Sequence, residues 1–197
     1  MDLVDPIELF QEWLAEATAA GDAEPTAMTL ATASADGVPS ARMVLLKGVD
    51  QRGFVFYTNG NSRKGRELAA NPRAALVFRW PVVHRQVTVT GSVTPLTAAE
   101  SDAYFATRER GSRIGAWASA QSEVLPGGRP DLDRQVALVE ARFAGVADIP
   151  RPPHRGRYLV TPDTVEFWSG LPNRLHDRLR YRRGPRDSHW HSEVLSP

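Results

Sequence analysis

Two neighbouring runs of sequence decide the fold of this chain: Ala74-Ala75-Leu76-Val77-Phe78-Arg79-Trp80 and Gln86-Val87-Thr88-Val89-Thr90-Gly91-Ser92-Val93. Both are short and contain many β-branched and aromatic residues, a composition that favours strands. Three similar runs precede them, at residues 28–33, 41–47 and 53–58, with turn signals between them. Residues 27–93 are therefore predicted to form consecutive short strands.

Helical patterns flank these strands. Asp5 and Pro6 suit an N-cap and a first helical residue, and apolar side chains then recur at helical spacing up to Gly21. Ser62 is predicted to cap a short helix that ends near Asn71-Pro72. Further helices are expected from a capping box at residues 97–100 to about residue 108, and at residues 131–144.

More strands are expected after the proline-rich connector at residues 150–153, at residues 157–160, 164–168, 178–182 and 189–195. Antiparallel-type strands with helices at their flanks predict an α+β fold, a Greek-key-like barrel rather than a βαβ sheet. The last 40 or so residues are too few for a core of their own. Residues 1–197 are thus expected to form one domain, with an N-terminal helix in residues 1–24 and barrel-completing strands in residues 150–197.

Composition excludes several functional classes. The chain has 197 residues and a net charge of +1, which argues against a nucleic-acid binder. No apolar run approaches the roughly 20 residues of a membrane span, so we expect no membrane partner and a cytoplasmic location. The absence of cysteine excludes disulfides and thiolate catalysis. The five histidines show no metal-ligand spacing with carboxylates, so no metal site is expected.

Two basic clusters suit anionic ligands. In an unbroken strand Arg42 and Lys47 point to opposite faces, so they should serve different anions unless a bulge intervenes. Arg63 and Lys64 follow Ser62 at a helix start, where free N–H groups and the helix dipole favour phosphate. The alternatives, a strand with charged ends and a plain helix cap, remain open from these residues alone.

Other polar groups could complete a site. Tyr104 and Arg108 are spaced for one helix face, with Ser112 just past the helix end, which would suit a second phosphate. Gln86 and the pair Gln121-Ser122 could form hydrogen bonds with the edge of a heteroaromatic ring. Each of these groups can equally be structural.

The hexapeptide Asn173-Arg174-Leu175-His176-Asp177-Arg178 has a third pattern. If it is extended, Arg174, His176 and Arg178 project from one face. Two guanidiniums around an imidazole suit a planar, anionic ligand. The alternative is a solvated polar strand face.

In chain order, these motifs resemble those of the pyridoxamine 5'-phosphate oxidase family. The resemblance runs from about residue 5 to the C-terminus, and Arg174-Leu175-His176-Asp177-Arg178 is its most specific part. It rests on Arg42-Met43-Val44-Leu45-Leu46-Lys47, Tyr57-Thr58, Ser62-Arg63-Lys64, Arg85-Gln86-Val87, Ile114-Gly115-Ala116-Trp117, Gln121-Ser122, Glu166-Phe167-Trp168 and Arg174-Leu175-His176-Asp177-Arg178.

The resemblance implies an FMN-binding split β-barrel and a homodimer with FMN at the subunit interface. The implied reaction of vitamin B6 metabolism is oxidation of pyridoxamine or pyridoxine 5'-phosphate to pyridoxal 5'-phosphate by O2, which releases H2O2. It is an oxidoreductase reaction at a CH–NH2 donor, with hydride passing from substrate C4' to flavin N5.

The resemblance also implies roles for individual residues. Arg174 and His176 would be catalytic, with Arg174 fixing the approach of the pyridine ring and His176 orienting it or assisting proton movement. The substrate phosphate would meet Lys47, Tyr104, Arg108 and Ser112. FMN would be bound by Arg42, Met43, Val44, Leu45, Tyr57, Thr58, Arg63, Lys64, Gln86, Gln121, Ser122, Trp168 and Arg178.

The chain departs from the family pattern at one internal segment. Where the family usually has Trp-Gly-Gly before an aromatic residue, this chain has Arg155-Gly156-Arg157-Tyr158. Two alternatives therefore stay open: a related FMN oxidase of secondary metabolism with a phenazine-type substrate, and a non-catalytic protein that binds flavin or pyridoxal phosphate.

Overall fold

A computed structural model of the chain describes residues 4–184 and 189–197. Its helices are α1 (Pro6–Ala19), α2 (Arg63–Ala70), α3 (Ala98–Ala106), α4 (Arg110–Ala118) and α5 (Arg129–Arg142), with a 3-10 turn at Pro172–Arg174. Its strands are β1 (Ala27–Ala33), β2 (Pro39–Asp50), β3 (Gly53–Asn59), β4 (Arg73–Trp80), β5 (Arg85–Pro95), β6 (Arg155–Ser169), β7 (Asp177–Arg182) and β8 (His191–Val194).

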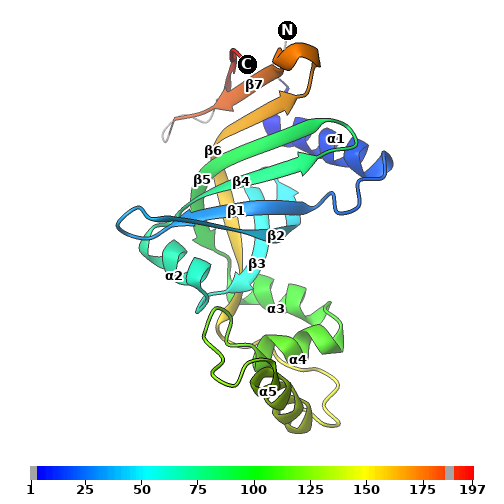
Figure 1. The fold of residues 1–197 in the computed structure, drawn as a ribbon, viewed down its shortest axis with the longest axis vertical. Coiled ribbons are helices and arrows are strands. Elements are labelled where there is room, and N and C mark those ends of the chain that lie inside the picture. The colour runs from blue at the N-terminus through cyan, green and yellow to red at the C-terminus, as the bar shows by residue number, and fades with distance from the viewer. Residues whose placement is uncertain (1–3, 185–188) are drawn as a thin grey trace.

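The strands form an antiparallel barrel. Their order is β3-β2-β1-β4-β5-β6-β7-β8, and an additional pairing of β3 with β6 closes six of them into a ring. Because β1, β2 and β3 are sequential neighbours and β4 returns beside β1, the order β4-β1-β2-β3 is a Greek key. Strands β7 and β8 continue the sheet beyond the ring (Figure 1). The predicted α+β barrel with flanking helices is confirmed.

Helix α1 covers one end of the barrel. Asp5 caps it through a 2.7 Å hydrogen bond from Ile7 N–H, and Pro6 occupies its first position, as predicted. Phe10 on this helix is fully buried, with its ring centroid 4.8 Å from those of both Phe54 and Phe78. Buried aromatic groups of this size dominate core stability, so this cluster fixes the barrel interior.

Residues 157–168 form part of one long strand, where the sequence suggested two. Pro162, which cannot donate a backbone hydrogen bond, lies in the middle of β6 opposite Gly91, where the register of β5 shifts. A Cβ on Gly91 would lie 2.1 Å from the Thr161 carbonyl oxygen. The bulge and the missing side chain let the two backbones approach closely, and the strand continues past the proline.

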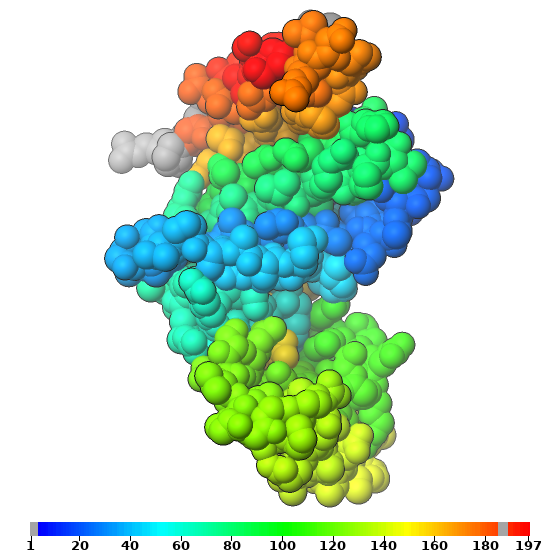
Figure 2. Space-filling view, viewed as in Figure 1, coloured from blue at the N-terminus to red at the C-terminus, as the bar shows by residue number. Residues whose placement is uncertain are grey.

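Helix α4 was missed by the sequence reading. Gly111 and Gly115 lower its helix propensity, and its N-cap, Glu109, makes no capping hydrogen bond. The helix is stabilised instead by packing, since Ile114 forms a small separate core with Phe143 and Ile149. Helices α3 to α5 form the lower lobe in Figure 2, below the strands. None of the described helices has the length and apolarity that crossing a bilayer requires.

Candidate active site

A cavity of about 230 Å³ opens where β2, β3 and the start of β6 meet the helical lobe. Its lining contains four cationic side chains and no carboxylate. The lining residues are Met43, Val44, Leu45, Lys47, Tyr57, Thr58, Lys64, Tyr104, Arg108, Gln121 and Arg155. Cations concentrated without counter-charges favour an anionic ligand. We call this space the cationic cavity.

Several polar atoms in this lining are buried without a partner. Among the described residues, seven buried side-chain nitrogen or oxygen atoms make no hydrogen bond. Four of the seven belong to the cationic cavity: Tyr57 Oη, Arg108 Nη1, Gln121 Oε1 and Arg155 Nε. Because leaving such atoms unsatisfied costs free energy, their clustering points to a polar ligand at this place.

Two aromatic side chains shape the cavity. The Tyr57 and Tyr104 rings lie 5.0 Å apart, and the Arg108 guanidinium lies 5.7 Å from the Tyr57 ring. Burial raises the pKa of Tyr57 to about 12, against the opposing effect of Arg151, Arg108 and Arg155. Its phenol is therefore a neutral hydrogen-bond donor at physiological pH.

Lys64 brings a buried ammonium to the cavity. It lies in the first turn of α2 and is only 6% exposed. Among the described residues, its only hydrogen bond is a 3.4 Å contact to Ser62 Oγ, the predicted N-cap of the helix. Burial, Arg42 and Arg155 lower the pKa of Lys64. No carboxylate in the described part of the chain lies within ion-pair distance of this buried ammonium, which a bound anion would therefore stabilise.

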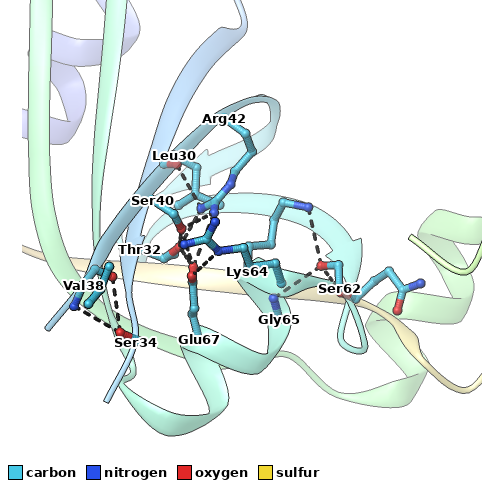
Figure 3. A network of polar contacts seen from close by, with 12 residues as sticks. Leu30, Thr32, Ser34, Val38, Ser40, Arg42, Ser62, Lys64, Gly65 and Glu67 are labelled. Carbon is cyan, nitrogen blue, oxygen red and sulfur yellow. Dashed lines mark hydrogen bonds and ion pairs between the residues drawn. The ribbon is translucent and has the colours of Figure 1, made fainter. Parts of the chain in front are cut away.

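Glu67 joins two more cations to this region (Figure 3). Its buried carboxylate accepts from Arg63 Nε at 2.8 Å and lies 3.3 Å from Arg42 Nη2. Ser40 and Thr32 also donate to it, at 2.6 and 2.5 Å. Two guanidiniums are thereby held in fixed positions beside Lys64. Sequence reading missed Glu67, although its i, i+4 spacing from Arg63 was a usable signal.

Arg42 and Lys47 lie on opposite faces of β2. The alternation of exposed and covered residues is regular from Pro39 to Lys47, and the register shifts only between Leu46 and Gly48. Lys47 lines the cationic cavity, whereas Arg42 forms an ion pair with Glu67. The opposite-face prediction is confirmed.

A second group of predicted residues lies at the far end of the barrel. Gln86, Trp168 and Arg178 are direct neighbours on β5, β6 and β7. Arg178 donates to Glu166 Oε1 at 2.8 Å and to the Ser196 carbonyl at 3.0 Å. These contacts fix the Arg178 guanidinium on a residue that pairs with Trp168 across the two strands.

The hexapeptide at residues 173–178 is not extended throughout, so the condition for Arg174, His176 and Arg178 to share one strand face is not met. Asn173 and Arg174 have φ values of 59° and 61°, and β7 begins only at Asp177. Left-handed backbone at two successive non-glycine residues makes a sharp turn and stores strain, a feature common at functional sites. The position of Arg174 is therefore set by this turn and not by the alternation of side chains along a strand. The turn leaves Arg174 exposed.

His176 still joins the second group. Its ring centroid is 4.6 Å from that of Trp168, and its Nδ1 accepts the Leu171 N–H at 3.1 Å. An accepting Nδ1 places the proton of the neutral ring on Nε2. His176 thus has one fixed nitrogen and one available for a ligand.

The two groups are far apart in one chain. Arg155 at the cationic cavity and Trp168 in the second group belong to the same strand, β6, and are separated by roughly 40 Å along it. Figure 1 shows the ends of β6 at opposite ends of the barrel. A single site containing both groups requires a second copy of the chain.

The predicted residues therefore fall into four sets: those that line the cationic cavity, those that adjoin it, those that are exposed and do not line it, and the second group. Arg42 and Arg63 adjoin the cavity through Glu67 and Lys64, and Ser112 and Ser122 are exposed and do not line it. Ser112 lies in the first turn of α4, not past a helix end, and Arg108 lies just beyond α3, not on its face. Ser122 has a φ of 75°. The second group comprises Gln86, Trp168, Arg174, His176 and Arg178.

These side chains fit a phosphorylated cofactor. A phosphate would supply the anion that Lys64 lacks, and the unpartnered Gln121 amide oxygen could accept from a ring N–H. The donor set is unsuited to a metal, and within residues 4–184 and 189–197 no cluster of metal-ligating side chains occurs.

A neighbouring cavity of about 510 Å³ is larger but chemically different. It lies between α2, α4 and α5, and its one arginine, Arg66, is paired with Glu123 at 2.9 Å. Because that charge is already compensated, the smaller cationic cavity is the better candidate for an anionic ligand.

Comparisons with known proteins agree with this geometry. The family model described as pyridoxamine 5'-phosphate oxidase matches residues 14–169, and that of the pyridoxine 5'-phosphate oxidase C-terminal dimerisation region matches residues 156–197. The chain is 57% identical to the pyridoxine/pyridoxamine 5'-phosphate oxidase of Thermosynechococcus vestitus and 55% identical to that of Salinibacter ruber. Each alignment covers 98% of this chain and 89% of the relative.

Solved structures of related proteins have the same fold as this chain. PhzG from Burkholderia lata, in complex with tetrahydrophenazine-1-carboxylic acid, superposes with a TM-score of 0.91 at 37% identity, covering 99% of this chain and 94% of that one. A related FMN-binding protein from Nostoc punctiforme shares the fold, with a TM-score of 0.74 at 18% identity over the full length of both chains. The chain belongs to the pyridoxamine 5'-phosphate oxidase family.

Proposed function

We propose that this protein is an FMN-dependent oxidase that converts pyridoxamine 5'-phosphate or pyridoxine 5'-phosphate to pyridoxal 5'-phosphate, with O2 as acceptor and H2O2 as a product. With the amine substrate, water is also consumed and ammonia is released. The observation that carries the proposal is the cationic cavity, with four positive side chains, no carboxylate and four unpartnered buried polar atoms. Such a lining suits phosphate groups better than neutral rings.

FMN would be held mainly by the residues around α2. Arg42, Arg63 and Lys64 would bind its phosphate, with Glu67 fixing the two guanidiniums. Tyr57, Thr58 and Gln121 would contact the remainder from the cavity wall, together with the strand segment Met43 to Leu45 and with Ser122. When bound, FMN supplies the two-electron acceptor that side chains cannot provide.

Lys47, Tyr104 and Arg108 would bind the substrate phosphate. All three line the cationic cavity, and Lys47 and Arg108 make no ion pair among the described residues. Ser112 completes the set from the first turn of α4, a short distance along the chain from Arg108. A phosphate bound here anchors the substrate, so the reacting carbon is held in one place.

Arg174 and His176 would address the pyridine ring. The turn at Arg174 fixes the direction in which its backbone presents the side chain, and the Leu171 N–H fixes the orientation of His176. His176 Nε2 can donate to the substrate or hold a proton during oxidation, whereas Arg174 restricts the approach angle of the ring.

The complete site would be formed by a homodimer. Since the cationic cavity and the second group lie at opposite ends of one barrel, Gln86, Trp168 and Arg178 of one protomer would reach the FMN held by its partner. The match of residues 156–197 to a dimerisation region supports this arrangement. The exposed apolar side chains of Met43 and Leu45 on β2 are available for such an interface.

The structural likeness to PhzG favours a second candidate, oxidation of a tricyclic ring acid. That ligand carries a single carboxylate, whereas a phosphate monoester carries up to two charges. The four cations of the cavity lining favour the phosphate ester. A protein that only binds flavin or pyridoxal phosphate is the third candidate.

Purified protein loaded with FMN tests the proposal. We expect aerobic incubation with pyridoxamine 5'-phosphate to give pyridoxal 5'-phosphate and H2O2 in equal amounts, measured by product absorbance and a peroxidase-coupled assay. Oxidation of a dihydrophenazine carboxylic acid but not of the phosphate ester would identify the second candidate. FMN uptake without oxidation of either would identify the third.

A further inference from the structure

Arg155 contributes a cation to the cationic cavity that none of the expected roles includes. It is the first residue of β6 and pairs with Asn59 at the end of β3, from which a short turn leads into α2. It lines the cavity together with Lys47, Lys64 and Arg108. Sequence reading noted Arg155 only as a departure from the family pattern.

The guanidinium of Arg155 has no partner among the described residues. Its Nε is buried and makes no hydrogen bond, and no ion pair involves it. Two nearby arginines do have counter-charges: Arg151 is paired with Asp102 at 2.6 Å, and Arg66 with Glu123 at 2.9 Å. Arg155 and Arg108 line the cationic cavity without an ion pair among the described residues, and each has a buried nitrogen that makes no hydrogen bond.

The surroundings of Arg155 are unfavourable for an isolated cation. Burial, and next the positive charge of Arg108, lower the pKa of Arg155. A partly desolvated guanidinium beside a like charge costs free energy unless an anion compensates both. A doubly charged phosphate between the two would do so, because each guanidinium can donate two parallel hydrogen bonds to it.

We propose that Arg155 binds the phosphate monoester of the substrate together with Arg108 and Lys47, and that it thereby selects phosphorylated over unphosphorylated substrates. This inference rests on the proposed function, whose site it extends by one residue. We assign Arg155 to the substrate phosphate and not to that of FMN because Arg42 and Arg63, which with Lys64 are proposed to bind the FMN phosphate, lie outside the cavity lining. The charge of Arg155 also lowers the pKa of Lys64, which is proposed to bind the FMN phosphate. The test must therefore measure binding of the substrate phosphate and binding of FMN separately.

Three variants of the FMN-loaded protein test the role of Arg155. Arg155→Gln removes the charge, Arg155→Lys keeps it, and Arg66→Gln makes the same charge change at the neighbouring cavity. For each we would measure the Kd for inorganic phosphate and for pyridoxal 5'-phosphate by titration calorimetry, the KM and kcat for pyridoxamine 5'-phosphate, and the Kd for FMN by fluorescence quenching. Thermal unfolding verifies that each variant is folded.

The inference predicts that Arg155→Gln weakens inorganic phosphate and pyridoxal 5'-phosphate by roughly 10- to 100-fold and raises KM similarly, since charged hydrogen bonds are lost. Both kcat and the Kd for FMN should change less than about threefold, and Arg155→Lys should recover most of the affinity. Arg66→Gln should behave as wild type.

Two results would overturn the inference: unchanged phosphate affinity in Arg155→Gln, or a loss of FMN affinity as large as the loss of substrate affinity. The proposed function fails separately, if the wild-type protein oxidises no phosphate ester. The phosphate titrations still decide the role of Arg155 in that case, because they need no turnover.

Discussion

Arg42 Nη2 lies 3.3 Å from Glu67 Oε2, in an ion pair whose carboxylate is only 7% exposed. The same carboxylate binds Arg63, so one buried acid fixes two of the cations proposed for the FMN phosphate. Glu67 is thus the structural counter-charge of these two arginines, and under the proposed function the FMN phosphate would be a second one.

Replacing Glu67 by Gln should therefore destabilise the FMN-free protein. Two guanidiniums lose their charged partner, which we expect to lower the free energy of unfolding by about 1–3 kcal/mol in urea denaturation. Added FMN or inorganic phosphate should stabilise this variant more than wild type, because the anion neutralises the freed cations. Glu123→Gln, which breaks the exposed pair with Arg66, is the matched control and should cost about 0–1 kcal/mol. Equal phosphate stabilisation of wild type and Glu67→Gln would refute the counter-charge role.

The same carboxylate predicts a pH dependence. Burial opposes ionisation of Glu67, but hydrogen bonds from Ser40, Thr32 and Arg63, with the charge of Arg42, lower its pKa to about 2 from an ordinary value of 4.5. A lowered folded-state pKa stabilises the fold above pH 4.5, and this contribution is lost as the pH falls towards 2. The stability difference between wild type and Glu67→Gln should therefore shrink below pH 4.5, and a constant difference down to pH 2 would contradict the assignment.

Arg174→Ala should separate catalysis from cofactor binding. Arg174 is proposed to contact the pyridine ring and not the FMN phosphate, so we expect kcat to fall by about 100-fold through lost substrate orientation. The Kd for FMN should change less than about threefold in fluorescence titrations. Equal losses in turnover and FMN affinity would disprove the division of roles.

A mixed dimer tests whether one site uses both protomers. Arg108→Gln damages the cationic cavity and Arg174→Ala damages the second group, so each variant alone should have little activity. In a shared-site dimer, hybrids contain one doubly damaged and one intact site, and a random mixture should regain about a quarter of wild-type activity. If the activity of the mixture after subunit exchange stays at the sum of the activities of the two separate variants, each site lies within a single protomer.

Gly91 tests the bulge that keeps β6 continuous past Pro162. A Cβ at position 91 would lie 2.1 Å from the Thr161 carbonyl oxygen, so Gly91→Ala should lower the free energy of unfolding by about 1–3 kcal/mol. At Gly115, inside α4, no atom lies within 4 Å of an added Cβ, and Gly115→Ala should raise stability by about 0.5–1 kcal/mol. Similar effects at both positions would contradict the close backbone approach at Gly91.

Much of the barrel was predictable because its signals are local. The strands around residues 28–93 show β-type composition, and Asp5, Ser62 and Thr97 mark helix starts through their side-chain chemistry. Helix α4 was not predictable in this way, since glycines weaken its propensity and its stability comes from contact with α5.

The site was predictable in its residue types but less so in its geometry. The opposite faces of Arg42 and Lys47 follow from strand alternation. The left-handed turn at Asn173 and Arg174 could not be predicted in this way, because the sequence has no glycine at these two positions. Glu67 and Arg155 could not be found from the sequence because their importance depends on tertiary contacts. Glu67 contacts strands distant in sequence, and Arg155 lies in a cavity with other cations that have no counter-charge among the described residues.

Anaerobic reduction of the bound flavin tests the central claim most directly. FMN-loaded protein is mixed with pyridoxamine 5'-phosphate, or with unphosphorylated pyridoxamine at the same concentration, and the loss of flavin absorbance is followed by stopped flow. The account predicts complete bleaching within one turnover by the phosphate ester, and bleaching by pyridoxamine that is slower by at least about 100-fold. Equal rates with the two amines, or flavin that stays oxidised with both, would contradict it.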